Sequence, residues 1–384
     1  MPGLLVRADS RHYRDDRGLA LKIPIPITVL TGFLGSGKTT LLKALLADPA
    51  MAGTAVIVNE FGEVGIDDAL IEAAKEETIL LPSGCVCCAV RGDLVEALGR
   101  LYGQAQDGTI PALNRVVLET SGLADPAPIA HTLMSEEDLF RVYQLDGIIA
   151  TADAELIVDQ LSQNFEPAKQ IAIADRLVLT KTDRANAALA AAGEQAIRRL
   201  NPAAQLSRIV SGAGASQLVA ELGAFEPIAA KHHADGWLHS EAYSHDAECD
   251  DPACGHHAHE HAPGHHHGHS HTHGIRSFAL SYDHPLDGAK LSVIMEMLRQ
   301  QHGEKLLRVK AIVNIEGEPL PFVVHGVQHM FYPPTTLEAW PTDERRSRFV
   351  FITKDLNEEA VSEVMAGMFA PPRPLSETDW GPGL

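Results

Sequence analysis

Short apolar runs alternate with helix-like segments from Ile23 to about residue 225. Ile27–Thr31 is followed by a glycine-rich turn and by Thr39–Ala47, whose spacing is typical of a helix. Further apolar runs, each followed by turn residues or a helix-like segment, lie at Ala55–Asn59, Arg115–Glu119, Gly147–Ala150 and Leu177–Thr180. Strands that alternate with helices form parallel βαβ units with helices on both faces of the sheet. The pattern therefore predicts a doubly wound α/β domain.

A second set of ordered elements begins at Ile275. Ile275–Ser281 is predicted to be a strand, and Asp287–Arg299 has the spacing of a helix. Three further strands and a closing helix are expected at Lys305–Val313, Pro321–Val324, Arg348–Ile352 and Glu358–Met368. Strands and helices in this mixture predict a small α+β domain.

The segment between these two parts lacks apolar periodicity and is rich in His, Gly and Ala, which predicts a flexible linker. We therefore divide the chain into five predicted segments. They are a flexible arm at 1–22, the α/β domain at 23–230, the His-rich linker at 231–273, the α+β domain at 274–370 and a frayed tail at 371–384.

Composition narrows the possible partners and compartment. The 384 residues carry a formal net charge of −20, which disfavours nucleic acid and anionic membranes as partners. Residues 1–22 contain no apolar signal-peptide core, and no stretch reaches the roughly 20 apolar residues of a membrane span. We expect a soluble, cytoplasmic protein. Three of its five cysteines lie at positions 85–88, which in a reducing compartment favours metal or redox chemistry over disulfides.

The segment Gly32–Thr39 matches the phosphate-loop (P-loop) pattern GxxxxGK[ST], with an apolar run before it and a helical run after it. Backbone N–H groups of such a loop bind phosphates, Lys38 reaches the β- and γ-phosphates, and the Thr39 hydroxyl binds Mg²⁺. This context disfavours a chance glycine-rich turn. The predicted nucleotide contacts are Gly32, Gly35, Ser36, Gly37, Lys38, Thr39 and the less certain neighbour Thr40.

The run Arg115–Glu119 ends in an acid. A carboxylate at the carboxyl end of a strand beside a P-loop holds the Mg²⁺ shell, and Glu119 is our candidate for this role. Gly122, in the following Thr-Ser-Gly, is expected to donate a backbone N–H to the γ-phosphate. The alternative is an ordinary strand end that faces solvent, which the P-loop makes less favourable.

The run Leu177–Thr180 leads into Thr180-Lys181-Thr182-Asp183. This fits [N/T]KxD, in which the Asp carboxylate accepts two hydrogen bonds that guanine can donate and adenine cannot. An unpaired buried carboxylate is unfavourable, so Asp183 predicts GTP over ATP. Lys181 is expected to lie along the base. Thr180 stands where Asn is usual, so we expect one side-chain amide contact to be missing.

Gly84 precedes the cysteine pattern CxCC at Cys85, Cys87 and Cys88. Thiolates are soft ligands that favour Zn²⁺ or Cu(I), and cobalt less strongly. Three thiolates leave a tetrahedral ion one ligand short, which suits metal exchange; Glu60, a nearby His or water is the candidate fourth ligand. Buried inert thiols and a redox pair are the alternatives, and the crowding and the lack of CxxC disfavour them.

Ten histidines lie between His256 and His273. A flexible string of imidazoles offers many weak sites for zinc, cobalt or nickel, which favours metal capture or storage. The alternative is a low-complexity linker whose histidines have no role.

Together these segments resemble the CobW-type P-loop GTPases, a group of metal chaperones, over residues 23 to about 368. The matching segments are TGFLGSGKTTLL at Thr31–Leu42, VNEFGEVGID at Val58–Asp67, SGCVCCAVRGDL at Ser83–Leu94, LETSGLADP at Leu118–Pro126, LTKTD at Leu179–Asp183 and KLLRVKAIV at Lys305–Val313. QIAIADRLVLTKTD at Gln170–Asp183 is most similar to YjiA-like members. The resemblance implies a CobW C-terminal domain, a switch region at Asn59–Asp67 and metal binding by the CxCC cysteines.

These features lead to one main hypothesis and three alternatives. The main hypothesis is a GTPase, slow without a partner, that binds zinc at CxCC and couples Mg·GTP binding and hydrolysis to metal delivery to a client protein. Lys38, Thr39, Glu119 and Glu60 are the candidate catalytic residues, the two glutamates as groups that position water. Storage of zinc or cobalt, activation of a cobalt enzyme and a small-molecule kinase are the alternatives. Client identity and oligomeric state stay open.

Overall fold

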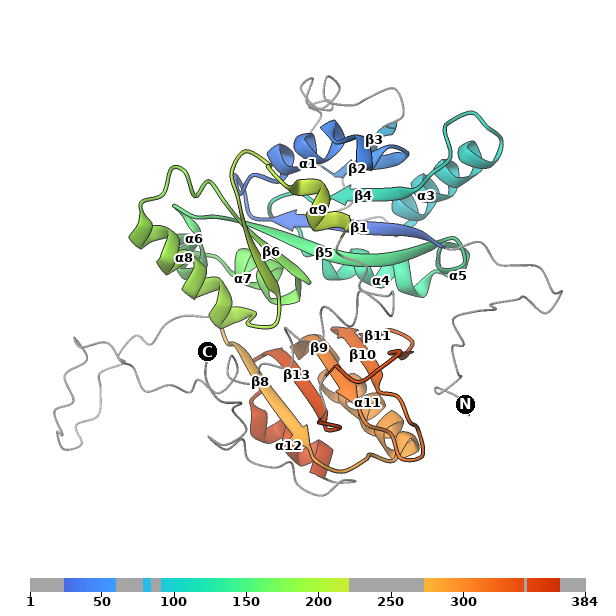
Figure 1. The fold of residues 1–384 in the computed structure, drawn as a ribbon, viewed down its shortest axis with the longest axis vertical. Helices are drawn as coiled ribbons and strands as arrows, with labels where there is room; N and C mark the ends of the chain where they lie inside the picture. Colours follow the sequence, from blue (N-terminus) through green and yellow to red (C-terminus); the bar gives the residue numbers. More distant parts are fainter. Residues whose placement is uncertain (1–23, 60–78, 84–90, 221–272, 342–343, 367–384) are drawn as a thin grey trace.

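Two β-sheets organise the molecule, one in each half of the chain (Figure 1). The computed structural model describes residues 24–59, 79–83, 91–220, 273–341 and 344–366. Within these ranges the first sheet has seven strands and the second has six. The predicted arm and tail, and the His-rich linker up to residue 272, lie outside the described residues.

The first sheet is parallel throughout, with strand order β3-β2-β4-β1-β5-β6-β7. Its strands are β1 (Ile25–Gly32), β2 (Thr54–Asn59), β3 (Ile79–Ser83), β4 (Arg115–Glu119), β5 (Tyr143–Asp153), β6 (Arg176–Thr180) and β7 (Gln205–Ile209). β1 is the middle strand of the sheet. Strands β2 to β4 lie on one side of it and β5 to β7 on the other, as in doubly wound folds. The predicted fold class is confirmed.

Helices bury both faces of this sheet. On one face, Leu30 packs with residues of α1 (Lys38–Ala47) and α9 (Ala215–Ala220), whereas its neighbour Val29 belongs to the core on the other face. Successive strand residues point to opposite faces, so a strand covered on both sides is apolar at nearly every position. The opposite face is covered mainly by α3 (Arg91–Gln106), α4 (Ala127–Ser135), α6 (Ile157–Gln163), α7 (Phe165–Ile173) and α8 (Ala187–Leu200), with α5 (Glu137–Phe140) beside α4.

The second sheet is antiparallel in the order β11-β10-β9-β13-β8, with β12 paired to β10. Its strands are β8 (Ile275–Tyr282), β9 (Leu306–Val313), β10 (Phe322–Val327), β11 (Met330–Phe331), β12 (Thr335–Thr336) and β13 (Ser347–Lys354). Helices α11 (Gly288–His302) and α12 (Glu358–Ala366) pack on one face. This is the expected small α+β unit.

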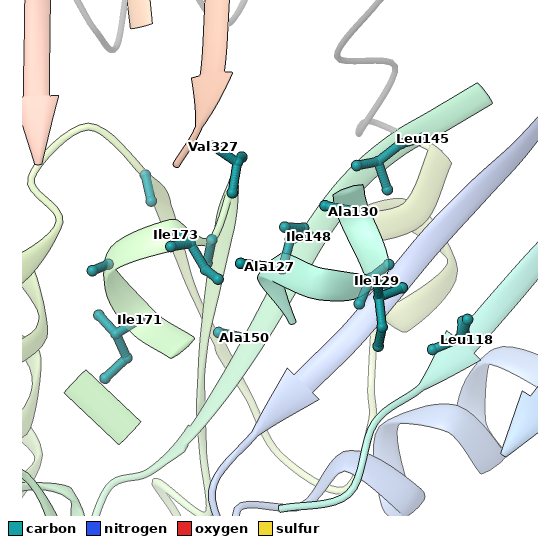
Figure 2. Close-up of a cluster of buried hydrophobic side chains, with 14 of the residues drawn as sticks. Leu118, Ala127, Ile129, Ala130, Leu145, Ile148, Ala150, Ile171, Ile173 and Val327 are labelled. Atoms are coloured by element: carbon teal, nitrogen blue, oxygen red, sulfur yellow. The ribbon is translucent and has the colours of Figure 1, made fainter. Parts of the chain in front are cut away.

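The other face of the second sheet packs on α4 and α7 of the first half (Figure 1). Figure 2 shows Val327 of β10 beside Ala127 and Ala130 of α4 and Ile173 of α7. The two halves therefore share part of one hydrophobic core. Ion pairs of Asp175 with Arg308 and Lys310 of β9 add to this contact.

The structure extends several predicted elements and adds others. Gly147–Ala150 proves to be the centre of β5, which has 11 residues. Strands β3 and β7 were not predicted, and the two-residue strands β11 and β12 have no periodicity to detect. β7 reads Gln-Leu-Ser-Arg-Ile and lies at the sheet edge, mostly half-buried or exposed, so its sequence lacks an apolar run. No helix in the described ranges is long and apolar enough to cross a membrane.

Candidate nucleotide site

The candidate nucleotide site lies at the carboxyl ends of the four adjacent strands β4, β1, β5 and β6. Ligands of open parallel sheets bind at this edge, where the strand order reverses. β1 leads into the P-loop and α1, β4 ends at Glu119, and β6 ends at Thr180. Residues far apart in the sequence are thus brought together.

The P-loop is pressed against the end of β5. A Cβ on Gly32 would lie 2.3 Å from the Thr151 Oγ1 and 2.7 Å from the Ser36 Oγ, and the Gly32 φ of 142° also disfavours any other residue. The hydroxyls of Ser36 and Thr151 are hydrogen-bonded at 2.7 Å. Gly37, with φ 94°, is the residue before α1, so the loop ends at a helix N-terminus. This is the backbone shape that binds phosphate.

Lys38 begins α1 and is buried. Its Nζ donates hydrogen bonds to the backbone carbonyls of Gly32, at 2.8 Å, and Phe33, at 3.2 Å. The ammonium group is therefore held within the curve of the loop, where a bound phosphate chain would meet it.

Thr39 and Glu119, the two candidate Mg²⁺ ligands, lie side by side. The Thr39 hydroxyl donates to Glu119 Oε1 over 3.2 Å, and Glu119 is 5% exposed. β4 is hydrogen-bonded to β1, which explains how two residues 80 positions apart lie side by side. A hydroxyl and a carboxylate are hard oxygen donors, so this pair fits Mg²⁺ completed by phosphate oxygens and water.

Gly122 approaches the P-loop very closely. A Cβ at this position would lie 2.7 Å from the backbone nitrogen of Leu34, so only glycine fits without a shift of the loop. Its carbonyl accepts a hydrogen bond from the buried Gln170 side chain at 3.1 Å. This placement beside the loop is compatible with the predicted contact of Gly122 to a γ-phosphate.

Thr180 makes a contact that the sequence did not suggest. Its hydroxyl lies 2.7 Å from the Ser36 carbonyl, in the P-loop, and 3.1 Å from the Ala152 carbonyl, at the end of β5. The hydroxyl thus connects the TKTD turn to the P-loop directly. The missing side-chain amide contact stays a prediction.

Lys181 forms a second tie between the TKTD turn and the P-loop. Its Nζ donates to the Gly35 carbonyl at 2.7 Å and to Asp153 Oδ2 at 2.6 Å. Thr151 and Asp153 are the site residues that the sequence analysis missed. Polar residues at the carboxyl end of a strand next to the P-loop strand would have pointed to them, had the full length of β5 been recognised.

Thr40 and Asp183 are both exposed. Thr40 lies in α1, and its carbonyl would lie 3.2 Å from a Cβ placed on Gly212. Asp183 lies in the turn that follows β6, two residues after Lys181. Its exposure leaves it accessible to a ligand.

Glu60, Cys85, Cys87 and Cys88 lie outside the described residues, as does Phe61–Asp67 of the expected switch region. The strands that precede them are described. β2 ends at Asn59 and β3 at Ser83, and these two residues are register partners. Within the described ranges, no group of three or more His, Cys, Asp or Glu side chains is arranged to hold a metal ion.

Two family models match the chain. The CobW/HypB/UreG nucleotide-binding domain matches residues 26–208, and the CobW C-terminal domain matches residues 275–368. The zinc chaperone YjiA of Escherichia coli is 34% identical over 345 residues, which cover 90% of this chain and 99% of YjiA. The zinc chaperone CobW of Pseudomonas aeruginosa is 31% identical, over 94% of this chain and 96% of that protein.

A solved structure is also similar. The crystal structure of Zn(II)-bound YjiA GTPase from E. coli matches with a TM-score of 0.64 and 31% identity, covering 91% of this chain and all of that one. The match extends over both sheets. The chain belongs to the CobW family of P-loop GTPases.

Proposed function

We propose that this protein is a GTP-hydrolysing metallochaperone that binds zinc through Cys85, Cys87 and Cys88 and delivers it to a client metalloprotein. One observation supports the coupling most directly. The strand that leads to Glu60, β2, is the neighbour of β4, which carries Glu119 of the nucleotide site, and the strand that leads to the cysteines, β3, is the next one along.

The strand register makes this proximity specific. Glu119 of β4 pairs with Val58 of β2, and Asn59 of β2 pairs with Ser83 of β3. Neighbouring strands are about 4.8 Å apart, so the chain leaves β3 roughly 10 Å from β4. Glu60 directly follows Asn59, and Cys85 comes two residues after Ser83. A nucleotide-dependent change at this edge would therefore reach the cysteine segment over a short path.

Thiolate chemistry and the relatives support zinc as the cargo. Cysteine thiolates bind Zn²⁺ well, and they stay reduced in the cytoplasm, where we place the protein. Two relatives that align over nearly their whole length are named zinc chaperones. The strongly acidic chain offers no general attraction to nucleic acid.

In this proposal, each residue of the nucleotide site has its own role in GTP binding and hydrolysis. Lys38 holds the β- and γ-phosphates, and Gly122 donates a backbone N–H to the γ-phosphate. Thr39 and Glu119 would hold Mg²⁺, which would supply positive charge to the phosphates. Asp183 recognises guanine, and Lys181 lies along the base. Glu60 is the candidate for orienting the attacking water.

The proposal requires zinc and nucleotide to change each other's affinity reciprocally. We expect zinc to bind far more tightly with a non-hydrolysable GTP analogue than with GDP; a thousandfold difference corresponds to about 4 kcal/mol of coupling. Titration against a high-affinity zinc chelator restricts the measurement to the tight site and excludes weak sites in the His-rich segment. Equal affinities in the two nucleotide states would overturn the coupling.

Two cysteine variants locate the tight site. Cys87→Ser should weaken zinc binding at least about tenfold, because one of three thiolate ligands is lost, while GTP binding is retained. Cys254→Ser is the matched control, since it removes a cysteine of the His-rich segment and should leave the tight site unchanged. Identical zinc affinity in the two variants would refute the assignment of the CxCC cysteines.

A further inference from the structure

Asp153 is a buried carboxylate at the nucleotide edge with no role in the function proposed above. It ends β5 and is 1% exposed. Its Oδ1 accepts a hydrogen bond from the Glu155 backbone N–H at 2.9 Å, and its Oδ2 accepts one from Lys181 Nζ at 2.6 Å. The first bond fixes the carboxylate on the chain that leaves β5. The second directs it at the TKTD turn.

Lys181 is held in an unusual backbone conformation. Its φ of 55° lies in the left-handed region, which a residue with a long side chain seldom adopts. Its side chain, which loses much conformational freedom when it is fixed, reaches across to the P-loop and donates to the Gly35 carbonyl at 2.7 Å. One hydrogen bond to a neutral carbonyl is a weak restraint for so long a side chain. The charge-assisted bond to Asp153 is the stronger of the two.

Thr180 and Lys181 both connect the TKTD turn to the P-loop, and both are also bonded to the end of β5. Asp153 is the register partner of Thr180, and the Ala154 N–H donates to the Thr180 carbonyl at 3.0 Å. The Thr180 hydroxyl bonds to the carbonyl of Ala152 and to that of Ser36 in the P-loop. β5 thus lies between the P-loop and the TKTD turn and contacts both, and Asp153 is the charged group at this junction.

We propose that Asp153 is a positioning residue for guanine nucleotide binding. Its carboxylate holds the Lys181 ammonium on the Gly35 carbonyl, and this holds the turn with Asp183 at a set position relative to the P-loop. A nucleotide contacts base and phosphate sites at once, so its affinity depends on that relative position. The inference rests on the proposed function, because the recognition of guanine by Asp183 belongs to it.

A double-mutant cycle tests whether Asp153 acts through Lys181. Asp153→Asn is expected to weaken GDP binding about tenfold, because it removes the charge-assisted bond to Lys181. Lys181→Ala removes this bond together with the Gly35 bond and the stem along the base, so its loss should be at least as large. The double variant should bind GDP like Lys181→Ala alone, since the Asp153 change finds the bond already absent. Binding of a fluorescent GDP derivative to the full chain gives all four dissociation constants. Wild-type affinity in Asp153→Asn, or additive losses in the cycle, would overturn the proposal.

Two further variants separate this outcome from general damage to the fold. Asp146→Asn removes a buried aspartate at the other half of β5, where it pairs with Arg115, and should leave GDP affinity unchanged. Asp183→Asn tests the proposed function itself. If it weakens GDP binding and Asp153→Asn does not, only the positioning role fails; if it has no effect, the guanine site is wrong. Should Asp153→Asn not fold, Asp153→Ser keeps an acceptor for the Glu155 N–H, and it must show the same tenfold loss.

Discussion

Two aspartates, Asp153 and Asp175, lie at opposite ends of the adjacent strands β5 and β6, and each pairs with a lysine. Asp153 is buried, and the Asp175 side chain is 9% exposed. Asp153 ends β5, whereas Asp175 directly precedes β6 and accepts the Ile148 N–H at 3.0 Å. The partner of Asp153 is Lys181, whose side chain is 30% exposed. The partners of Asp175 are Arg308 and Lys310 of β9, each 4% exposed.

The two regions differ in how far the positively charged side chain is exposed to solvent. Around Asp175, burial raises its pKa, but the charges of Arg308 and Lys310 outweigh burial and lower the pKa to about 2. Burial also lowers the pKa of Lys310 to about 8, although Asp175 opposes this. Such a sealed cluster joins the two halves of the molecule and offers a ligand no access. At Asp153 the cation stays at the surface, in a strained turn, beside the P-loop. The same pair of groups therefore joins the two halves of the molecule in one place and, by our proposal, positions the nucleotide site in the other.

The largest expected effect is at the sealed cluster. Asp175→Asn removes a buried counter-charge from Arg308 and Lys310, and we expect it to destabilise the protein by about 3 kcal/mol. Urea unfolding of wild type and variant measures the difference. Under conditions in which both proteins are fully folded, their affinities for GDP should be the same. A large loss of GDP affinity would show that the cluster also acts on the nucleotide site, so that the two aspartates would not have separate roles.

The stability difference between wild type and Asp175→Asn should also depend on pH. The folded-state pKa of Asp175, about 2, lies below its unfolded value of 3.8. The stabilisation is therefore complete above about pH 4 and is lost as the pH falls through 2. Unfolding curves of both proteins at several pH values should converge at the acid end. A difference that stays constant down to about pH 2 would mean that another group is responsible.

A smaller effect is expected on the nucleotide side. Thr180→Val removes the hydroxyl that lies between the P-loop and β5, which leaves the Ser36 carbonyl without this donor. We expect a loss of stability of about 1 kcal/mol, together with a severalfold loss of GDP affinity. Thr180→Ser keeps the hydroxyl and serves as the matched control. If both variants bind GDP like wild type, the hydroxyl has no part in holding the two loops together.

The elements that the sequence predicted well are those whose cause is local. Strands buried on both faces, such as β1 and β4, need an apolar residue at almost every position, so their runs are visible without a structure. The P-loop is likewise a continuous segment in which each residue type has its own reason. Glu119 could be placed beside the P-loop in advance because carboxyl ends of parallel strands share one edge.

The remainder depends on contacts between distant positions. Asp153 and Lys181 are 28 residues apart and meet only because β5 pairs with β6 in one register. The Thr180 hydroxyl reaches a carbonyl 144 residues earlier in the chain, so its role was invisible in the local motif. Whether a charge faces a partner, a ligand or solvent follows from strand register. The roles of Cys85, Cys87 and Cys88 stay predictions.

The smallest expected effect comes from a third charge pair, which is mostly exposed. Glu137 and Arg141 lie four residues apart, at the start and just past the end of α5, with side chains 79% and 70% exposed. Water screens both charges, so Glu137→Gln should change stability by less than about 0.5 kcal/mol, and less still in about 1 M salt. Urea unfolding at low and high salt measures this. A loss as large as that of Asp175→Asn would show that pairing alone sets the energy. If the free energies of unfolding of Glu137→Gln and wild type are nearly equal, burial is the property that distinguishes the Asp175 cluster from an exposed ion pair.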